Sequence, residues 1–130
     1  AIIVVRFQGP KANGMPELHG LTPILAVLQD RGLKVALITD GRMSGASGKV
    51  PAAIHLSPES ANSGPISKIK NGDLIRLDAR SGELNILDEN FQIRESRKKD
   101  LSENERGLGR ELFNIFRENA SAAKFGGGIT

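Results

Sequence analysis

The chain has 130 residues and no cysteine, so it forms no disulfide bond and supplies no thiolate ligand to zinc or to an iron–sulfur cluster. Its net charge of +3 is too mild to favour a nucleic-acid partner, and no apolar run approaches the length of a membrane span. We therefore expect one domain over residues 1–130, and the lack of cysteine and of a signal peptide favours a cytoplasmic location.

The first predicted element is a buried strand at residues 2–7, because this run is apolar and rich in β-branched side chains. The chain begins inside this strand, so we expect it to be a piece cut from a longer protein. A polar loop with glycine and proline turn signals follows at residues 8–17. In this loop Lys11 and Glu17 carry groups that suit a ligand, although an ordinary connecting loop with solvated charges fits the same residues.

A helix is predicted next. Thr22 is a good N-cap residue, and Pro23 falls in the first turn, where its missing N–H costs nothing. Gly32 is a favourable residue just after the helix end. A second buried strand is predicted at residues 35–38. Such a strand–helix–strand unit can bring the loops that follow both strands to the same end of a sheet.

The segment at residues 34–48 has the composition of a functional loop on the end of a strand. Its glycines let another backbone or a ligand approach closely, and Arg42 supplies a fork of donors suited to carboxylate or phosphate. Ser44 and Ser47 add hydroxyl groups. Composition alone fits a tight surface turn at least as well.

The second half of the chain has the pattern of short strands with turns between them. Asn-Gly and Ser-Gly turns and two-residue alternation favour an antiparallel meander. A capping box then predicts a late helix that continues to about residue 118. The predicted strands are at residues 50–56, 65–69, 73–79 and 83–87, a short helix is at 90–99, and the capping box is at 102–105.

These elements predict a mixed α/β fold. Several strands are short and non-local, so a compact β-barrel or sandwich with flanking helices fits them better than a doubly wound parallel sheet. The glycine spacings of Walker and Rossmann nucleotide sites are missing from the chain. His19 and His55 have no partner at metal-ligand spacing in the sequence.

Five segments form an ordered set of motifs that spans essentially the whole chain. They are RFQGPKANGMPE (6–17), LITDGRMSGASG (37–48), HLSPES (55–60), GPISKIKNGDLIRLD (64–78) and GRELF (109–113). Together they resemble the C-terminal domain of the dihydroxy-acid and sugar-acid dehydratases. The first, second and last segments are most similar to the branch of that family that acts on a sugar-acid phosphate.

The resemblance implies a swivelling β/β/α fold, with a β-barrel core and flanking helices, and a hydro-lyase reaction. In the family an iron–sulfur cluster, expected here as 4Fe-4S, acts as Lewis acid on the departing hydroxyl. The cluster cysteines belong to a larger N-terminal domain that is absent from this chain. The full-length protein is then expected to be a homodimer that acts on a small-molecule sugar-acid phosphate, with its own N-terminal domain as partner.

The resemblance also assigns roles to individual residues. Ser44 matches the serine proposed as the base that removes the C2 proton, and Glu17 matches a glutamate that ligates Mg²⁺ in part of the family. Lys11, Arg42 and Ser47 lie in the motif loops and are candidates for binding substrate carboxylate or phosphate, because charge-assisted bonds to such oxyanions are strong.

Three alternatives remain open. The first is a dihydroxy-acid or other sugar-acid dehydratase. The second is a small module that binds an anion in the glycine–serine loop without catalysis. The third is a nucleic-acid binder, for which the support is weak because no aromatic residues interleave with its basic cluster. That cluster consists of Arg94, Arg97, Lys98 and Lys99.

Overall fold

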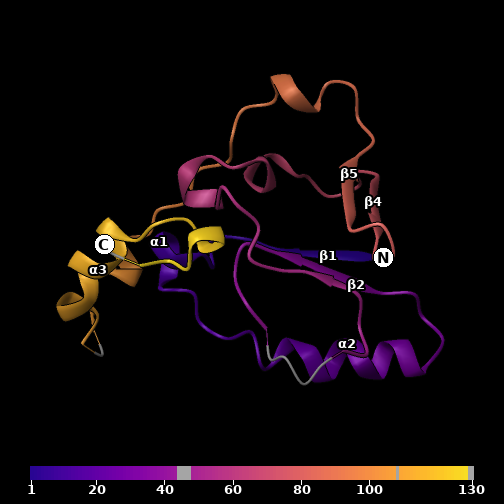
Figure 1. Cartoon of the computed structure of the whole chain (residues 1–130), viewed down its shortest axis with the longest axis horizontal. Coiled ribbons are helices and arrows are strands. Elements are labelled where there is room, and N and C mark those ends of the chain that lie inside the picture. The colour runs from indigo at the N-terminus through magenta and orange to yellow at the C-terminus, as the bar shows by residue number, and fades with distance from the viewer. Residues whose placement is uncertain (44–47, 108, 129–130) are drawn as a thin grey trace.

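The computed structural model describes residues 1–43, 48–107 and 109–128. Its strands and α-helices are shown in Figure 1: β1 (Ile2–Val5), α1 (Pro10–Asn13), α2 (Leu21–Asp30), β2 (Ala36–Thr39), β3 (Ala52–Ala53), β4 (Ile75–Asp78), β5 (Glu83–Ile86) and α3 (Asn114–Asn119). Short 3-10 helices lie at Ser60–Asn62, Pro65–Lys68, Phe91–Ile93, Ser102–Asn104, Arg110–Phe113 and Ala123–Phe125.

The strands form two separate sheets. β1, β2 and β3 make a parallel sheet in that order, and β1 pairs with β2 from Ile2↔Ala36 to Val5↔Thr39. β4 and β5 make an antiparallel hairpin. In Figure 1 helix α2 runs below the parallel sheet, whereas α1, α3 and the C-terminus gather at the end opposite the hairpin.

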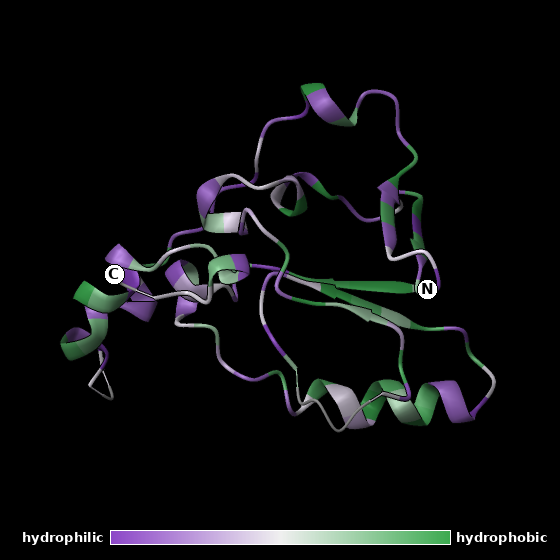
Figure 2. Cartoon of the chain, in the orientation of Figure 1, coloured by the Kyte–Doolittle hydropathy of each residue, from purple (hydrophilic) through white to green (hydrophobic). Residues whose placement is uncertain are grey.

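The parallel sheet is buried on both faces, because successive side chains of a strand point to opposite sides. On one face Leu37 packs with Leu25 of α2. On the other face Ile38 packs with Ile66 and Phe91, in a cluster that includes side chains of the hairpin. Figure 2 shows that the residues of β1 and β2 are mostly hydrophobic. The buried strand predicted at residues 35–38 is therefore confirmed as β2, whereas the strand predicted at residues 2–7 is shorter, Ile2–Val5, and half-buried.

Helix α2 is confirmed, but its predicted N-cap is wrong. The helix begins at Leu21 with Gly20 before it, and no side chain caps it. Thr22 therefore lies inside the helix, and its buried Oγ1 has no hydrogen-bond partner among the described residues. Gly32 follows the helix with φ 85°, as expected of a residue that ends a helix.

The hairpin is also confirmed. Ile75 faces Ile86 and Leu77 faces Leu84 across the two strands, and these half-buried residues alternate with exposed ones. This alternation is the period-two pattern of a strand with one face on the core.

Arg94 ties the chain on both sides of the hairpin together. Its guanidinium donates to Asp73 at 2.6 and 3.0 Å and also to Asp88. The hydrogen bond to Asp73 raises the pKa of Arg94, and the same bond lowers the pKa of Asp73. This member of the basic cluster is therefore engaged within the domain rather than presented to a nucleic acid.

Two predicted strands are wrong or much shorter than expected. Residues 65–69 form a 3-10 turn, because Pro65 lacks an N–H and the Ser67 hydroxyl donates to the Gly64 carbonyl at 2.7 Å. The strand predicted at 50–56 is reduced to Ala52–Ala53, since Pro51 has no N–H to donate and His55 has a left-handed φ of 57°.

The predicted helices of the second half are also mostly short turns. Residues 90–99 contain a single 3-10 turn at Phe91–Ile93, and the expected capping box yields only the turn Ser102–Asn104, without a side-chain cap. The late helix is confirmed in its second half as α3. One helix was missed, since α1, inside the predicted loop at 8–17, is too short for its periodicity to be recognised.

The mixed α/β class is confirmed, whereas the closed β-barrel core is not. The described residues form a three-stranded parallel sheet and a two-stranded antiparallel hairpin, with no closed barrel among them. Within the described ranges no helix is both long and apolar enough to cross a membrane.

Candidate functional site

The candidate site lies at the carboxyl ends of β1 and β2. Because these strands are parallel, the chain leaves both of them at the same edge of the sheet. The side chain of Asp40, at the end of β2, is fully buried there. Its two oxygens accept the backbone N–H groups of Phe7 at 3.2 Å, Gln8 at 3.0 Å and Ser60 at 2.8 Å. One carboxylate thus joins three chain segments.

The segments approach each other very closely at this edge. A Cβ atom on Gly41 would lie 2.7 Å from Gln8 Cβ, so only glycine fits. The Gly41 carbonyl accepts the N–H of His55 at 2.9 Å. The close approach expected of the glycines in this loop is confirmed at Gly41. The motif segments 6–17, 37–48 and 55–60 therefore meet at this edge.

Glu17 and Arg42 are brought together, as the strand–helix–strand interpretation predicted. The two residues form an isolated parallel bridge, in which Leu18 N–H donates to the Arg42 carbonyl at 3.0 Å. Arg42 Nε donates to the Met15 carbonyl at 2.9 Å, while the residue itself is exposed. The Arg42 side chain therefore contacts the backbone of the loop that carries Glu17.

Lys11 lies on α1, which is anchored by a buried carboxylate. Glu59 accepts the backbone N–H groups of Lys11 at 3.1 Å and Ala12 at 2.7 Å. Burial raises the pKa of Glu59, and these two hydrogen bonds oppose the shift. A Cβ atom on Gly9 would lie 2.5 Å from Glu59 Oε2, so the packing requires glycine there. The Lys11 residue itself is exposed.

Ser44 and Ser47 lie outside the described residues. Their predicted roles as base and substrate ligand therefore stay predictions.

Glu17 does not form a metal site by itself. Within the described ranges no group of three or more His, Cys, Asp or Glu side chains could hold a metal ion. Mg²⁺ needs an octahedral set of oxygen ligands, of which a single carboxylate supplies only a part. The donor set of the described residues thus fits one magnesium ligand, not a complete site.

A groove of about 900 Å³ extends from this site toward the C-terminal segment. Sequence reasoning missed two of its residues, Arg110 and Arg117, although GRELF was recognised as a motif. The groove is lined by Arg42, Arg110, Arg117, Met15, Phe113 and Phe116, together with Pro10, Asn13, Gly14, Pro16, Ala120 and Gly126 to Gly128. Lys11 does not line it.

The family model of the dihydroxy-acid/6-phosphogluconate dehydratase C-terminal domain matches residues 1–127. The chain therefore belongs to this family of dehydratase C-terminal domains, and the resemblance seen in the motifs is confirmed.

The relatives point to one branch of the family. The chain is 59% identical over 130 residues to the phosphogluconate dehydratase of Rhizobium meliloti (strain 1021), covering 98% of this chain and 22% of the relative. It is 54% identical over 127 residues to that of Escherichia coli (strain K12), covering 96% and 21%. The dihydroxy-acid dehydratase of Methanosphaera stadtmanae is 39% identical over 109 residues, covering 82% and 19%. The chain spans about a fifth of the length of these relatives.

Proposed function

We propose that this chain is the C-terminal domain of a hydro-lyase that dehydrates 6-phospho-D-gluconate to 2-dehydro-3-deoxy-6-phosphogluconate, a step of the Entner–Doudoroff pathway. The observation that carries the proposal is the identity of 54–59% to phosphogluconate dehydratases over nearly the whole chain, against 39% to a dihydroxy-acid dehydratase. The isolated chain is then inactive, because the rest of the active site belongs to the remainder of the enzyme.

Ser44 is the proposed base that removes the C2 proton. A serine hydroxyl is a poor base until a nearby cation lowers its pKa. The arrangement of Glu17 and Arg42 at the end of β2, two residues before Ser44, supports this role. Arg42 and Ser47 are proposed to bind substrate oxyanions. Lys11 has the weakest support, since its exposed side chain does not line the groove.

The cofactor of the full-length enzyme is proposed to be a 4Fe-4S cluster. The chain contains no cysteine, so the cluster ligands lie in another part of the enzyme. When bound, the cluster supplies a Lewis acid for the C3 hydroxyl that leaves. Glu17 is proposed as one ligand of Mg²⁺ in a site that needs further ligands from outside the described residues.

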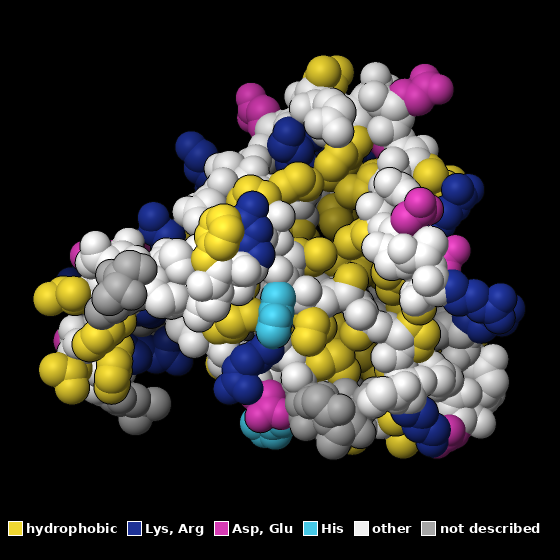
Figure 3. Space-filling view, in the orientation of Figure 1, with side chains coloured by type: hydrophobic (Ala, Val, Ile, Leu, Met, Phe, Trp, Pro, Cys, Tyr) yellow, Lys and Arg dark blue, Asp and Glu magenta, His cyan; other side chains and the backbone are white. Residues whose placement is uncertain are grey.

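The N-terminal domain is the proposed partner of this chain, in an enzyme that is homodimeric and cytoplasmic. The support for a covering domain is a set of hydrophobic side chains that the C-terminal segment leaves exposed, and Figure 3 shows hydrophobic side chains gathered over α3. These residues are Leu112, Phe113, Ile115, Phe116 and Phe125. We also propose that the two sheets, which share one apolar cluster, belong to the barrel of a swivelling β/β/α domain.

Replacing Ser44 tests the catalytic part of the proposal. In the full-length enzyme, Ser44→Ala is expected to lower kcat for 6-phosphogluconate by about 10²- to 10⁴-fold, the contribution typical of a general base. KM should change little, because the hydroxyl acts on the proton and not on binding. The matched control is Ser81→Ala in the exposed β4–β5 turn, which should leave kcat unchanged. A Ser44→Ala enzyme that keeps about a tenth of the wild-type kcat would exclude Ser44 as the base.

A further inference from the structure

Arg110 and Arg117 are anchored in the groove by neutral partners. Arg110 Nη1 donates to Asn13 Oδ1 at 3.0 Å, which links the GRELF motif to α1. Arg117 donates to the Asn104 carbonyl and to Asn114 Oδ1. Among the described residues neither guanidinium contacts a carboxylate within salt-bridge distance. Their positive charges are therefore oriented by hydrogen bonds but not neutralised.

Both guanidinium groups can donate hydrogen bonds to a further acceptor. A guanidinium has five N–H donors, and the contacts of Arg110 occupy only part of its fork. Arg117 Nε is buried and has no hydrogen-bond partner among the described residues. Because unpaired charged donors that are removed from water are costly, an anion in this groove would be stabilising.

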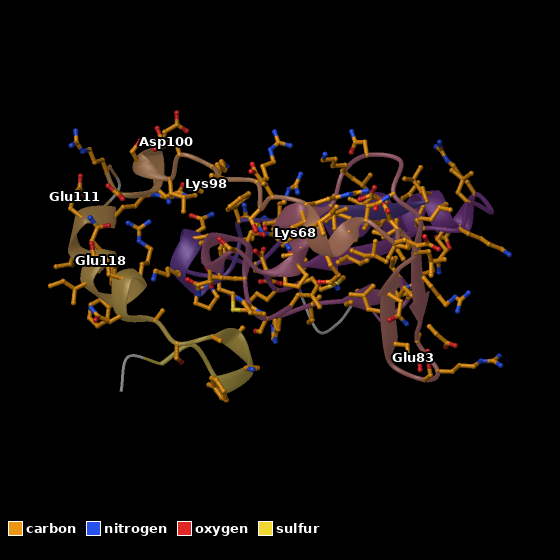
Figure 4. All side chains as sticks on the ribbon, turned by 90° about the horizontal axis from the view of Figure 1, so that it is seen from above. Lys68, Glu83, Lys98, Asp100, Glu111 and Glu118 are labelled. Atoms are coloured by element: carbon orange, nitrogen blue, oxygen red, sulfur yellow. The ribbon has the colours of Figure 1, made fainter. Side chains whose placement is uncertain are left out.

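The acidic residues next in sequence do not supply that anion. Glu111 and Glu118 follow the two arginines, but successive residues of a helix diverge around its axis, and neither glutamate lines the groove. Glu111 accepts the Gly107 N–H at 2.8 Å instead. In Figure 4 both glutamates lie on the C-terminal segment, at the end of the molecule opposite Glu83 of the hairpin.

The remaining wall of the groove suits a carbon chain. Phe113 and Phe116 stand with ring centroids 6.1 Å apart, and Met15 also lines the groove. These side chains offer apolar surface beside the arginine forks, and such forks match the geometry of a phosphate. Arg42 lines the same groove where it meets the site at the end of β2. One groove thus carries three arginines, Arg42 from the loop after β2 and Arg110 and Arg117 from the C-terminal segment.

We propose that Arg110 and Arg117 bind the phosphate ester of the substrate, while its reacting end lies beside Arg42 and Glu17. The proposal rests on the proposed function and deepens it, since it makes the C-terminal segment the part of the domain that selects a phosphorylated sugar acid. Arg110 and Arg117 are then substrate-binding residues that determine specificity.

The test compares two substrates in the full-length enzyme. We would measure kcat/KM for 6-phosphogluconate and for gluconate, which lacks the phosphate. Arg110→Met should lower the ratio of these values by about 10- to 100-fold, the loss expected for a charge-assisted bond. The fraction of folded enzyme cancels in this ratio, so a loss of stability cannot imitate the result. If gluconate turnover is too slow to measure, a raised KM for 6-phosphogluconate and weaker inhibition by inorganic phosphate serve as the readout.

Two further variants sharpen the test. Arg106→Met removes the same charge from an exposed position outside the groove, so the ratio should be unchanged. Arg110→Lys keeps the charge but loses the fork, and it should fall between wild type and Arg110→Met. If the wild-type enzyme dehydrates 6-phosphogluconate and neither Arg110 variant changes the ratio or KM, the inference is overturned and the proposed function stands. A wild-type enzyme without turnover of 6-phosphogluconate would overturn both.

Discussion

Asp40 connects three stretches of chain through hydrogen bonds from single backbone N–H groups. In Asp40→Asn, the amide NH₂ would replace one of the two oxygens and would face either the N–H of Gln8 or those of Phe7 and Ser60. We expect the free energy of unfolding to fall by about 3 kcal/mol, measured by denaturant titration.

The control is Asp30→Asn, the same chemical change in an exposed ion pair with Lys49. Exposed pairs contribute at most about 1 kcal/mol, so this variant should unfold almost as the wild type does. Equal losses in the two variants would contradict the role of Asp40.

At the residue scale, the sequence predicts where chain segments meet better than it predicts what joins them. The proximity of Glu17 and Arg42 follows from two parallel strands that end at one edge. The roles of Asp40 and Glu59 could not be predicted, because their partners lie 20 to 48 positions away and are mostly backbone N–H groups that any residue provides. Arg110 was missed for the same reason, since Asn13 is 97 positions distant.

Helix α2 holds one face of the parallel sheet mainly through Leu25, which is 2% exposed. Leu25→Ala would leave a cavity against Leu37 and Val50, so we expect a loss of about 2–5 kcal/mol in the free energy of unfolding. The neighbouring Ile24 is 59% exposed. Ile24→Ala should change stability by less than about 0.5 kcal/mol. A similar cost for both changes would show that α2 does not pack as described.

At the element scale, prediction succeeded where a periodic pattern was long or complete. The α2 segment has apolar residues at helical spacing. The β4–β5 hairpin has both the two-residue alternation of apolar side chains and the turn residues between its strands. It failed at residues 65–69, where tertiary packing decides the backbone. A Cβ atom on Gly64 would lie 1.8 Å from the Pro58 carbonyl oxygen, a close approach that no local pattern reveals.

At the scale of the whole molecule, the domain combines a well-packed sheet with a C-terminal segment rich in exposed hydrophobic residues. The sheet positions the Glu17 and Arg42 loops, and the C-terminal segment contributes Arg110 and Arg117 to the groove that Arg42 also lines. The motifs predicted the family, and the strand–helix–strand pattern predicted that the loops after both strands meet at one edge of the sheet. They could not reveal the groove, because it forms only when α1 packs beside α3.

The most direct test of the account is the turnover of 6-phosphogluconate, followed as formation of the keto acid in the absence of oxygen. The isolated chain would be compared with the full-length enzyme at equal molar concentration. We predict turnover by the full-length enzyme alone, since this chain supplies only part of the active site and no cysteine ligand for a cluster. Turnover by the isolated chain, or none by the full-length enzyme, would contradict the proposed function.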